Sequence, residues 1–167
     1  MADFKIELDL SELQTARKQL EQLRASMGDL RPLLEAIRED LLWSHEDRAR
    51  REVAPQGHAW ARLNPAYAAG KRGSRILRAS GRMLSLSSRV EGDTVIIGSG
   101  AKYAATHQFG ATIRPKAKKA LRFQMGGRWF TKKSVTIPAR PFLGVSEQDR
   151  DNMAETVVEF AQEALGK

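Results

Sequence analysis

Cysteine is absent from this chain of 167 residues, and aromatic residues make up only 7% of it. Without cysteine the chain has neither a disulfide framework nor a thiolate metal site, which fits a reducing compartment. Apolar runs are also short, because none approaches the roughly 18 residues that a membrane-crossing helix needs. These absences favour a soluble protein made in a cytosol, and the length favours one domain with its own core, or one domain plus a protruding arm.

Acidic side chains are nearly missing from the middle of the chain. Residues 48–140 carry 20 Lys and Arg against three acidic residues, a net charge of +17. The flanks, 1–47 and 141–167, carry 8 basic and 17 acidic residues, a net charge of −9. This division suits a basic face toward nucleic acid, or head-to-tail contact between the acidic part of one copy and the basic part of the next.

Motifs that carry chemistry are missing as well. His45, His58 and His107 are scattered, and no pair has the i, i+4 spacing of a helical metal site. The stretch GSGAK at 98–102 lacks the Walker spacing and reads as a turn from a strand to a helix, and no serine lies in a G-x-S-x-G elbow. We therefore expect no enzyme activity, no catalytic residue, no cofactor and no metal.

The first fifty residues predict a strand and a helical hairpin. Polar and apolar residues alternate over 4–10, the period of a strand. A capping-box pattern at Ser11 then opens an apolar stripe that predicts a helix over 11–27. A second helix follows over 32–42, with proline in its first turn. We favour a packed α-layer over an arm that docks on another subunit, because ordinary core burial explains such stripes most often.

The middle of the chain predicts a long connection followed by short elements. Residues 53–73 have no sustained period, and Trp60 within them is expected to anchor the connection to the body. A short helix is expected over 74–84. Two strands then follow, over 84–90 and 94–97, joined by a turn.

The last third predicts two helices around a hairpin. Residues 102–109 form two helical turns ended by Gly110. The clearest hairpin of the chain spans 121–135, and Ser146 caps a final amphipathic helix. Together these elements predict an α+β fold with a mainly antiparallel sheet and a long β-hairpin, packed by an N-terminal helical hairpin and a C-terminal helix.

The stretch IPARPFLG at 137–144 predicts a stiff strap. Each proline fixes φ near −65° and pushes the preceding residue into an extended conformation. The strap then presents two large apolar residues, which we expect in a core or against a neighbouring subunit. Its defining residues are Pro138, Arg140, Pro141, Phe142 and Leu143.

The predicted hairpin is strongly basic. A phosphate-facing surface, a contact with another subunit and simple solvation all fit such a charge, and no motif for sequence-specific readout accompanies it. We favour subunit contact. The candidate interface or lumen residues are Arg114, Lys116, Lys118, Lys119, Arg122, Arg128, Lys132 and Lys133.

Four stretches, in this order, resemble the phage virion morphogenesis family, the tail completion proteins of Mu-like phages and prophages. They cover roughly residues 50–165: PQGHAWARL at 55–63, ILRASGRM at 76–83, VIIGSGAKYAATHQFG at 95–110 and IPARPFLG at 137–144. With this resemblance we expect a single tail-completion-like domain over 1–167, in which a strand and helical hairpin over 1–50 precede a family-like core over 51–167.

The resemblance implies a non-enzymatic structural protein of the virion, in the tail or neck, assembled in the cytoplasm of a bacterial host. It implies a ring, most simply a homo-hexamer, that terminates the tail tube at its head-proximal end and joins the head connector. DNA passing through the lumen is a further possible partner, and no membrane is expected. Two alternatives stay open: a head-side neck component, meaning a stopper or adaptor, and a non-specific DNA-binding protein.

Overall fold

The structure is a computed structural model that describes residues 28–71, 73–78 and 82–164. The strand predicted over 4–10 and the helix predicted over 11–27 lie outside these residues. In chain order the elements are α2 (Arg31–Arg51), α3 (Pro65–Gly70), β1 (Leu86–Glu91), β2 (Thr94–Ser99), α4 (Ala104–Phe109), β3 (Ala111–Ile113), β4 (Leu121–Met125), β5 (Arg128–Lys132), β6 (Val135–Ile137) and α5 (Glu147–Ala164). None of the described helices is both long and apolar enough to span a membrane.

Helix α2 confirms the second predicted helix and continues it beyond Leu42. Pro32 lies in the first turn, where a missing N–H costs no hydrogen bond. Leu33 and Leu41 are buried on one face of the helix. The helix ends at Glu52, whose left-handed backbone (φ 59°) lets its N–H donate to the carbonyl of Arg48.

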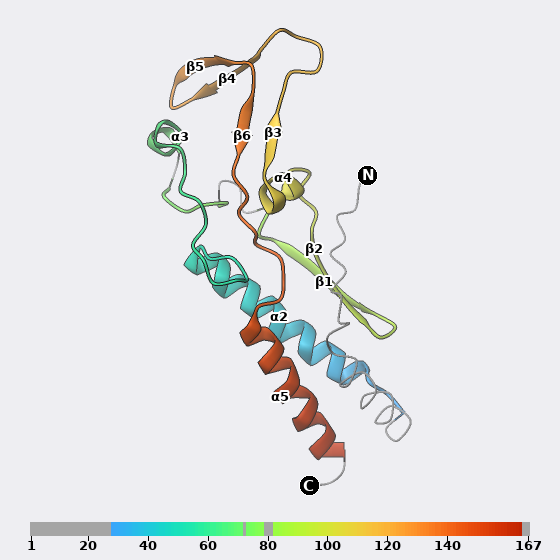
Figure 1. The fold of residues 1–167 in the computed structure, drawn as a ribbon. Helices are drawn as coiled ribbons and strands as arrows, with labels where there is room; N and C mark the ends of the chain where they lie inside the picture. The colour runs from blue at the N-terminus through green and yellow to red at the C-terminus, as the bar shows by residue number, and fades with distance from the viewer. Residues whose placement is uncertain (1–27, 72, 79–81, 165–167) are drawn as a thin grey trace.

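Helix α5 lies beside α2 (Figure 1). Its N-terminus is closed by a reciprocal cap, as predicted from Ser146. The Ser146 hydroxyl accepts from Asp149 N at 3.1 Å, and Asp149 Oδ2 accepts from Ser146 N at 2.7 Å. The two helices run antiparallel, since Arg48 contacts Asp149 while Asp40, two turns earlier in α2, accepts from Thr156 further along α5.

Strands β1 and β2 form the predicted hairpin, with Glu91 opposite Thr94 at its turn. The helix expected over 74–84 is wrong, because the described residues of this segment form turns and Leu77 has a left-handed φ of 58°. The physical reason is tertiary. Ile76 is buried in the core, and its N–H donates to the Glu52 carboxylate at 2.8 Å instead of to a helical carbonyl.

The remaining strands build an arm that projects away from α2 and α5 (Figure 1). Strands β3 and β6 pair at its base, and β4 and β5 pair at its end, confirming the predicted hairpin. The described strands therefore form three separate antiparallel pairs. Helices combined with antiparallel pairs confirm the α+β class.

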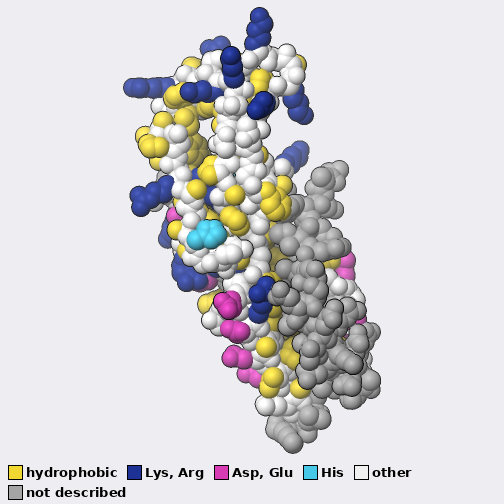
Figure 2. Space-filling model, viewed as in Figure 1, with side chains coloured by type: hydrophobic (Ala, Val, Ile, Leu, Met, Phe, Trp, Pro, Cys, Tyr) yellow, Lys and Arg dark blue, Asp and Glu magenta, His cyan; other side chains and the backbone are white. Residues whose placement is uncertain are grey.

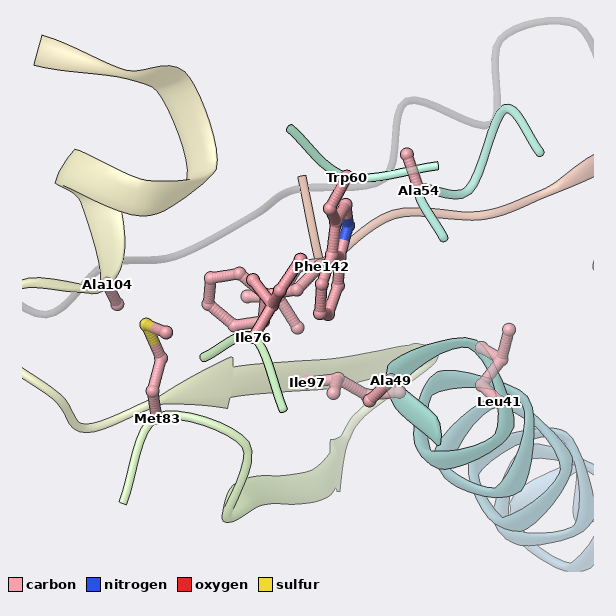
Figure 3. Packing of buried hydrophobic residues seen from close by; sticks show 10 residues of the cluster. Leu41, Ala49, Ala54, Trp60, Ile76, Met83, Ile97, Ala104 and Phe142 are labelled. Atoms are coloured by element: carbon pink, nitrogen blue, oxygen red, sulfur yellow. The ribbon is translucent and has the colours of Figure 1, made fainter. Parts of the chain in front are cut away.

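The core lies where α2, the β1–β2 hairpin and the strap meet. Phe142 from the strap packs with Trp60 and Ile76, while Ile97 from β2 and Ala49 from α2 join the same cluster (Figure 3). Trp60 is 4% exposed, which confirms its predicted anchoring role. The long connection is therefore pinned to the body at this indole, as expected for a large aromatic in a loop.

One short helix within the 53–73 connection was not predicted. Helix α3 begins after Asn64, whose side chain accepts from Ala66 N at 3.0 Å, and Pro65 occupies its first position. The Asn-Pro pair is a sequence signal for a helix start. With only six residues, the helix shows no apolar period that would have revealed it.

A buried ion pair joins the two long helices to the strap. Arg48 Nη1 lies 2.6 Å from Asp149 Oδ2, and the two side chains are only 5% and 2% exposed. The same guanidinium donates to Ser44 Oγ at 2.6 Å and to the Gly144 carbonyl at 2.8 Å, and Ser44 donates to Asp149 Oδ1. One arginine thus holds α2, the end of the strap and the start of α5.

Removing the charge of Asp149 should strongly destabilise the fold. We expect Asp149→Asn to lower the unfolding free energy by about 3–5 kcal/mol, because it leaves the Arg48 guanidinium buried without its counter-ion. Asp151→Asn, an exposed carboxylate two residues further along α5, is the matched control and should cost less than about 1 kcal/mol. Chemical denaturation measures both, and equal losses would contradict the role of the pair.

Candidate assembly surfaces

The strap lies inside the molecule, as one of the two predicted placements required. Phe142 and Leu143 are each 3% exposed, and Arg140 is also buried. Pro138 is exposed and Pro141 is half-buried, so the prolines shape the chain while the apolar pair anchors it. This favours core anchoring over direct contact of Phe142 with another subunit.

A single glutamine clamps the backbone of the strap. The Gln108 carbonyl oxygen accepts from Phe142 N at 3.0 Å and from Leu143 N at 3.1 Å, and its amide donates to the Leu143 carbonyl at 2.8 Å. Gln108 is itself buried on α4. Three polar backbone groups of a non-regular segment are thereby satisfied without a neighbouring strand.

Arg140 and Trp60 connect the strap to the chain that leads to α3. The Arg140 guanidinium donates to the Ala61 carbonyl at 2.7 Å and to the Arg62 carbonyl at 3.0 Å. The Trp60 indole N–H donates to the Pro141 carbonyl at 2.7 Å. The strap therefore fixes the directions in which both α5 and the 61–71 segment leave the core.

His45 on α2 is held neutral beside the strap. Its Nδ1 lies 2.5 Å from the Leu41 carbonyl, and its Nε2 accepts from Gly144 N at 3.3 Å. Burial lowers the pKa of His45, outweighing the Leu41 carbonyl that raises it, and the nearby Arg48 charge adds to the lowering. A proton on Nε2 would oppose the Gly144 N–H, so the fold selects the neutral ring.

The arm gathers all eight predicted interface residues, and every one of them is exposed. They occupy the β3–β4 connection, both strands of the β4–β5 hairpin and the residue after β5. Residues 111–137 contain no Asp or Glu. The structure thus brings the candidate residues onto one projecting element, while their partner stays a prediction.

A second segment, which contains α3, packs against this arm. The sequence did not predict this contact. Helix α3 packs against the β4–β5 turn so closely that a Cβ on Gly126 would lie 2.5 Å from the Ala66 carbonyl oxygen. A Cβ on Gly70 would likewise lie 2.5 Å from the Gly126 Cα. We call residues 61–71 and 111–137 together the distal lobe. No local signal links these segments, which are forty residues apart.

The distal lobe holds ten Lys and Arg and no acidic residue, because 61–71 contributes Arg62 and Lys71. The other 18 Lys and Arg of the chain are offset by 20 Asp and Glu. In Figure 2 the basic side chains project around the arm, and acidic side chains gather toward the helices. The charge of the molecule is therefore divided between a basic lobe and the more acidic helices.

Two aromatic contacts shape the end of the lobe. The Arg122 guanidinium lies 4.8 Å from the ring centre of Trp129, which is 62% exposed. Phe123 and Phe130 stack on the other face of the hairpin, with ring centres 6.0 Å apart. The hairpin thus offers an exposed cation–aromatic face and keeps its phenylalanines half-buried.

The opposite pole is acidic and also exposes a tryptophan. Helix α5 carries six carboxylates and one arginine, and residues 39–47 of α2 carry four carboxylates and no Lys or Arg. Trp43, at the centre of 39–47, is 65% exposed. Sequence reasoning assigned the acidic flank but not this residue. In the described residues, no group of three or more His, Asp or Glu side chains is arranged to hold a metal ion.

The chain belongs to the phage virion morphogenesis family, whose model matches residues 11–161. It is therefore a structural or assembly protein of phage particles. The chain is similar to the protein called Mu-like prophage FluMu G protein 2 of Haemophilus influenzae, at 25% identity over 158 residues that cover 94% of this chain and 96% of the relative. No solved structure matches the chain.

Stability should depend on pH through His45. Its folded pKa lies below the unfolded value of 6.5, so its contribution is complete above that pH and is lost as the pH falls toward the folded pKa. We expect the unfolding free energy to fall between about pH 7 and pH 5. His45→Gln should lower stability at pH 7 and flatten this dependence. Burial lowers the pKa of His107 too, so His107→Gln should also flatten part of this dependence. It should cost less stability at pH 7 than His45→Gln, because its ring does not bond the strap end as His45 bonds the Gly144 N–H.

The packing of α3 on the arm can be tested with two neighbouring glycines. Gly126 and Gly127 both have positive φ, yet a Cβ on Gly127 would meet nothing within 4 Å. Gly126→Ala should therefore separate α3 from the hairpin, whereas Gly127→Ala should add only the backbone strain that both share. Hydrogen exchange of residues 65–70 should rise at least severalfold in Gly126→Ala alone. Equal exchange in both variants would show that α3 does not depend on this contact.

Proposed function

We propose that this protein completes the phage tail at its head-proximal end and joins it to the head connector as a homo-oligomeric ring. Family membership supports a role in virion morphogenesis. The observation that carries the finer proposal is the division of one subunit into a basic distal lobe and an acidic helical pole (Figure 2). Such a subunit has two different surfaces that complement each other.

Complementary surfaces on one subunit favour head-to-tail association. A head-to-tail contact repeats from copy to copy and closes into a ring when the rotation between copies permits it. Six copies are the proposed number, because a ring that ends a tail tube has to match the sixfold symmetry common among tubes. The role is structural, without enzyme chemistry.

The proposed partners are further copies of the chain, the tail tube protein and the head–tail connector. The protein would reside in the tail or neck of the virion after assembly in the host cytoplasm. A ring with part of its basic surface on the lumen would tolerate passing DNA, since phosphates and Lys or Arg attract one another. Solvent screening keeps that attraction weak enough for passage.

Deletion of the gene should leave heads intact and produce tails of abnormal length or tails that do not join heads. Electron microscopy of lysates measures both outcomes, and expression of the intact chain from a plasmid is the control. Normal free tails with leaky heads would instead favour a head-side stopper or adaptor.

Quantitative mass spectrometry of purified tails should find about six copies per particle, and a single copy would contradict the ring.

A further inference from the structure

The exposed face of α2 combines a tryptophan with acidic residues, and a face that only contacts solvent does not need the tryptophan. Trp43 stands at its centre, and the positions three and four residues before and after it are all acidic. Side chains at these spacings are neighbours on a helix surface. The four residues around the indole are Glu39, Asp40, Glu46 and Asp47.

The indole of Trp43 lies on the side of α2 opposite the core, while Asp40 at the edge of this face accepts from Thr156 of α5 at 3.3 Å. The core side of α2 is formed by Leu41, His45 and Ala49, which are buried, whereas Trp43 is largely exposed. An indole this open leaves a large apolar surface in water, and tryptophan is enriched at the centres of protein interfaces. Among the residues that the structure describes, nothing covers the indole, so the face has the character of a docking surface.

Contacts within the subunit hold the surrounding carboxylates only weakly. Glu39 pairs with Arg38 at 3.2 Å, and Asp47 pairs with Arg51 at 2.8 Å, with partly exposed side chains in both pairs. Solvent screens exposed pairs of this kind, and they contribute little to stability, so a partner can displace them. Glu46 makes no ion pair with any residue in the described part of the chain.

The distal lobe has the positive charge that complements the acidic Trp43 face. It carries ten cations and no acid, and its own Arg122 already lies over the indole of Trp129. A guanidinium or ammonium group on the Trp43 ring would make the same contact and also meet the flanking carboxylates. Within one subunit the arm points away from α2 (Figure 1), so the lobe has to come from another copy.

We propose that the Trp43 face of α2 is the docking surface for the distal lobe of a second copy of this chain, with a lobe Arg or Lys stacked on the indole between the four carboxylates. The inference rests on the proposed ring and specifies its subunit contact. Because the two surfaces differ, each subunit donates its lobe to one neighbour and receives the lobe of another.

A photo-crosslinking residue tests this contact directly. The full chain with Trp43→benzoylphenylalanine is prepared in an isotope-labelled and an unlabelled form, and equal amounts are mixed before they assemble onto particles from the deletion strain. The particle fraction that contains the protein is irradiated and digested. We expect crosslinked peptides from residues 61–71 or 111–137, with half of the pairs joining labelled to unlabelled copies. Crosslinks within one copy, to another virion protein, or none would overturn the inference.

Paired variants give a second measurement. Trp43→Ala with Glu46→Lys should lower the yield of completed particles about tenfold or more, because it removes an interface tryptophan and reverses a charge. Phe109→Ala with Glu91→Lys is the matched control, since it removes an exposed aromatic side chain and reverses an exposed charge outside both the distal lobe and the acidic pole. Equal yields from the two variants, with both proteins folded, would contradict the docking face.

The lobe is tested in the same way. Lys118→Glu with Lys119→Glu should lower the particle yield, and Lys102→Glu with Arg150→Glu is the control for charge outside the lobe. A crosslinker at Lys118 that captures DNA in filled particles, instead of α2 of another copy, would replace the inference with a DNA-facing lobe. Failure of the proposed function would give a different result from failure of this inference. The protein would then be absent from tails, but the crosslink between two copies would still form.

Discussion

The contact between Arg48 and Asp149 holds together the three segments on which the rest of the molecule depends. It joins α2 to α5 at the point where the strap ends, and the second amino group of the forked guanidinium donates to the Gly144 carbonyl. A buried pair costs desolvation energy, so its gain over apolar packing is small. Its value here is geometric, because one guanidinium links Ser44 on α2, Asp149 on α5 and the strap backbone at Gly144.

The strap determines the directions in which the chain leaves this junction. Gln108 and Trp60 satisfy its backbone, while Arg140 binds the two carbonyls from which the chain continues toward α3. Two outgoing directions are therefore set within a few residues, that of α5 on one side and that of the arm on the other. The poles of the molecule stay apart because the elements that carry them leave the same rigid centre in different directions.

Much of the fold followed from local patterns. The Ser146 cap, the apolar spacing of α2 and the glycine turn of the β4–β5 hairpin each depend on contacts between residues close in sequence, so each was predicted. The helix expected over 74–84 was wrong because the Ile76 N–H donates to the carboxylate of Glu52, a residue distant in sequence, instead of to a helical carbonyl. Helix α3 was missed because it has too few residues to show a period.

The sequence by itself determined the charge of each segment, the apolar character of Phe142 and Leu143, and the basic hairpin, since composition and short-range spacing decide these properties. Only the tertiary structure decided that 61–71 joins the hairpin to form one acid-free lobe, and that Trp43 stands on the outer face of α2. Both depend on which face of each element is buried in the core. Core burial is settled by packing between distant segments, and no single segment encodes it.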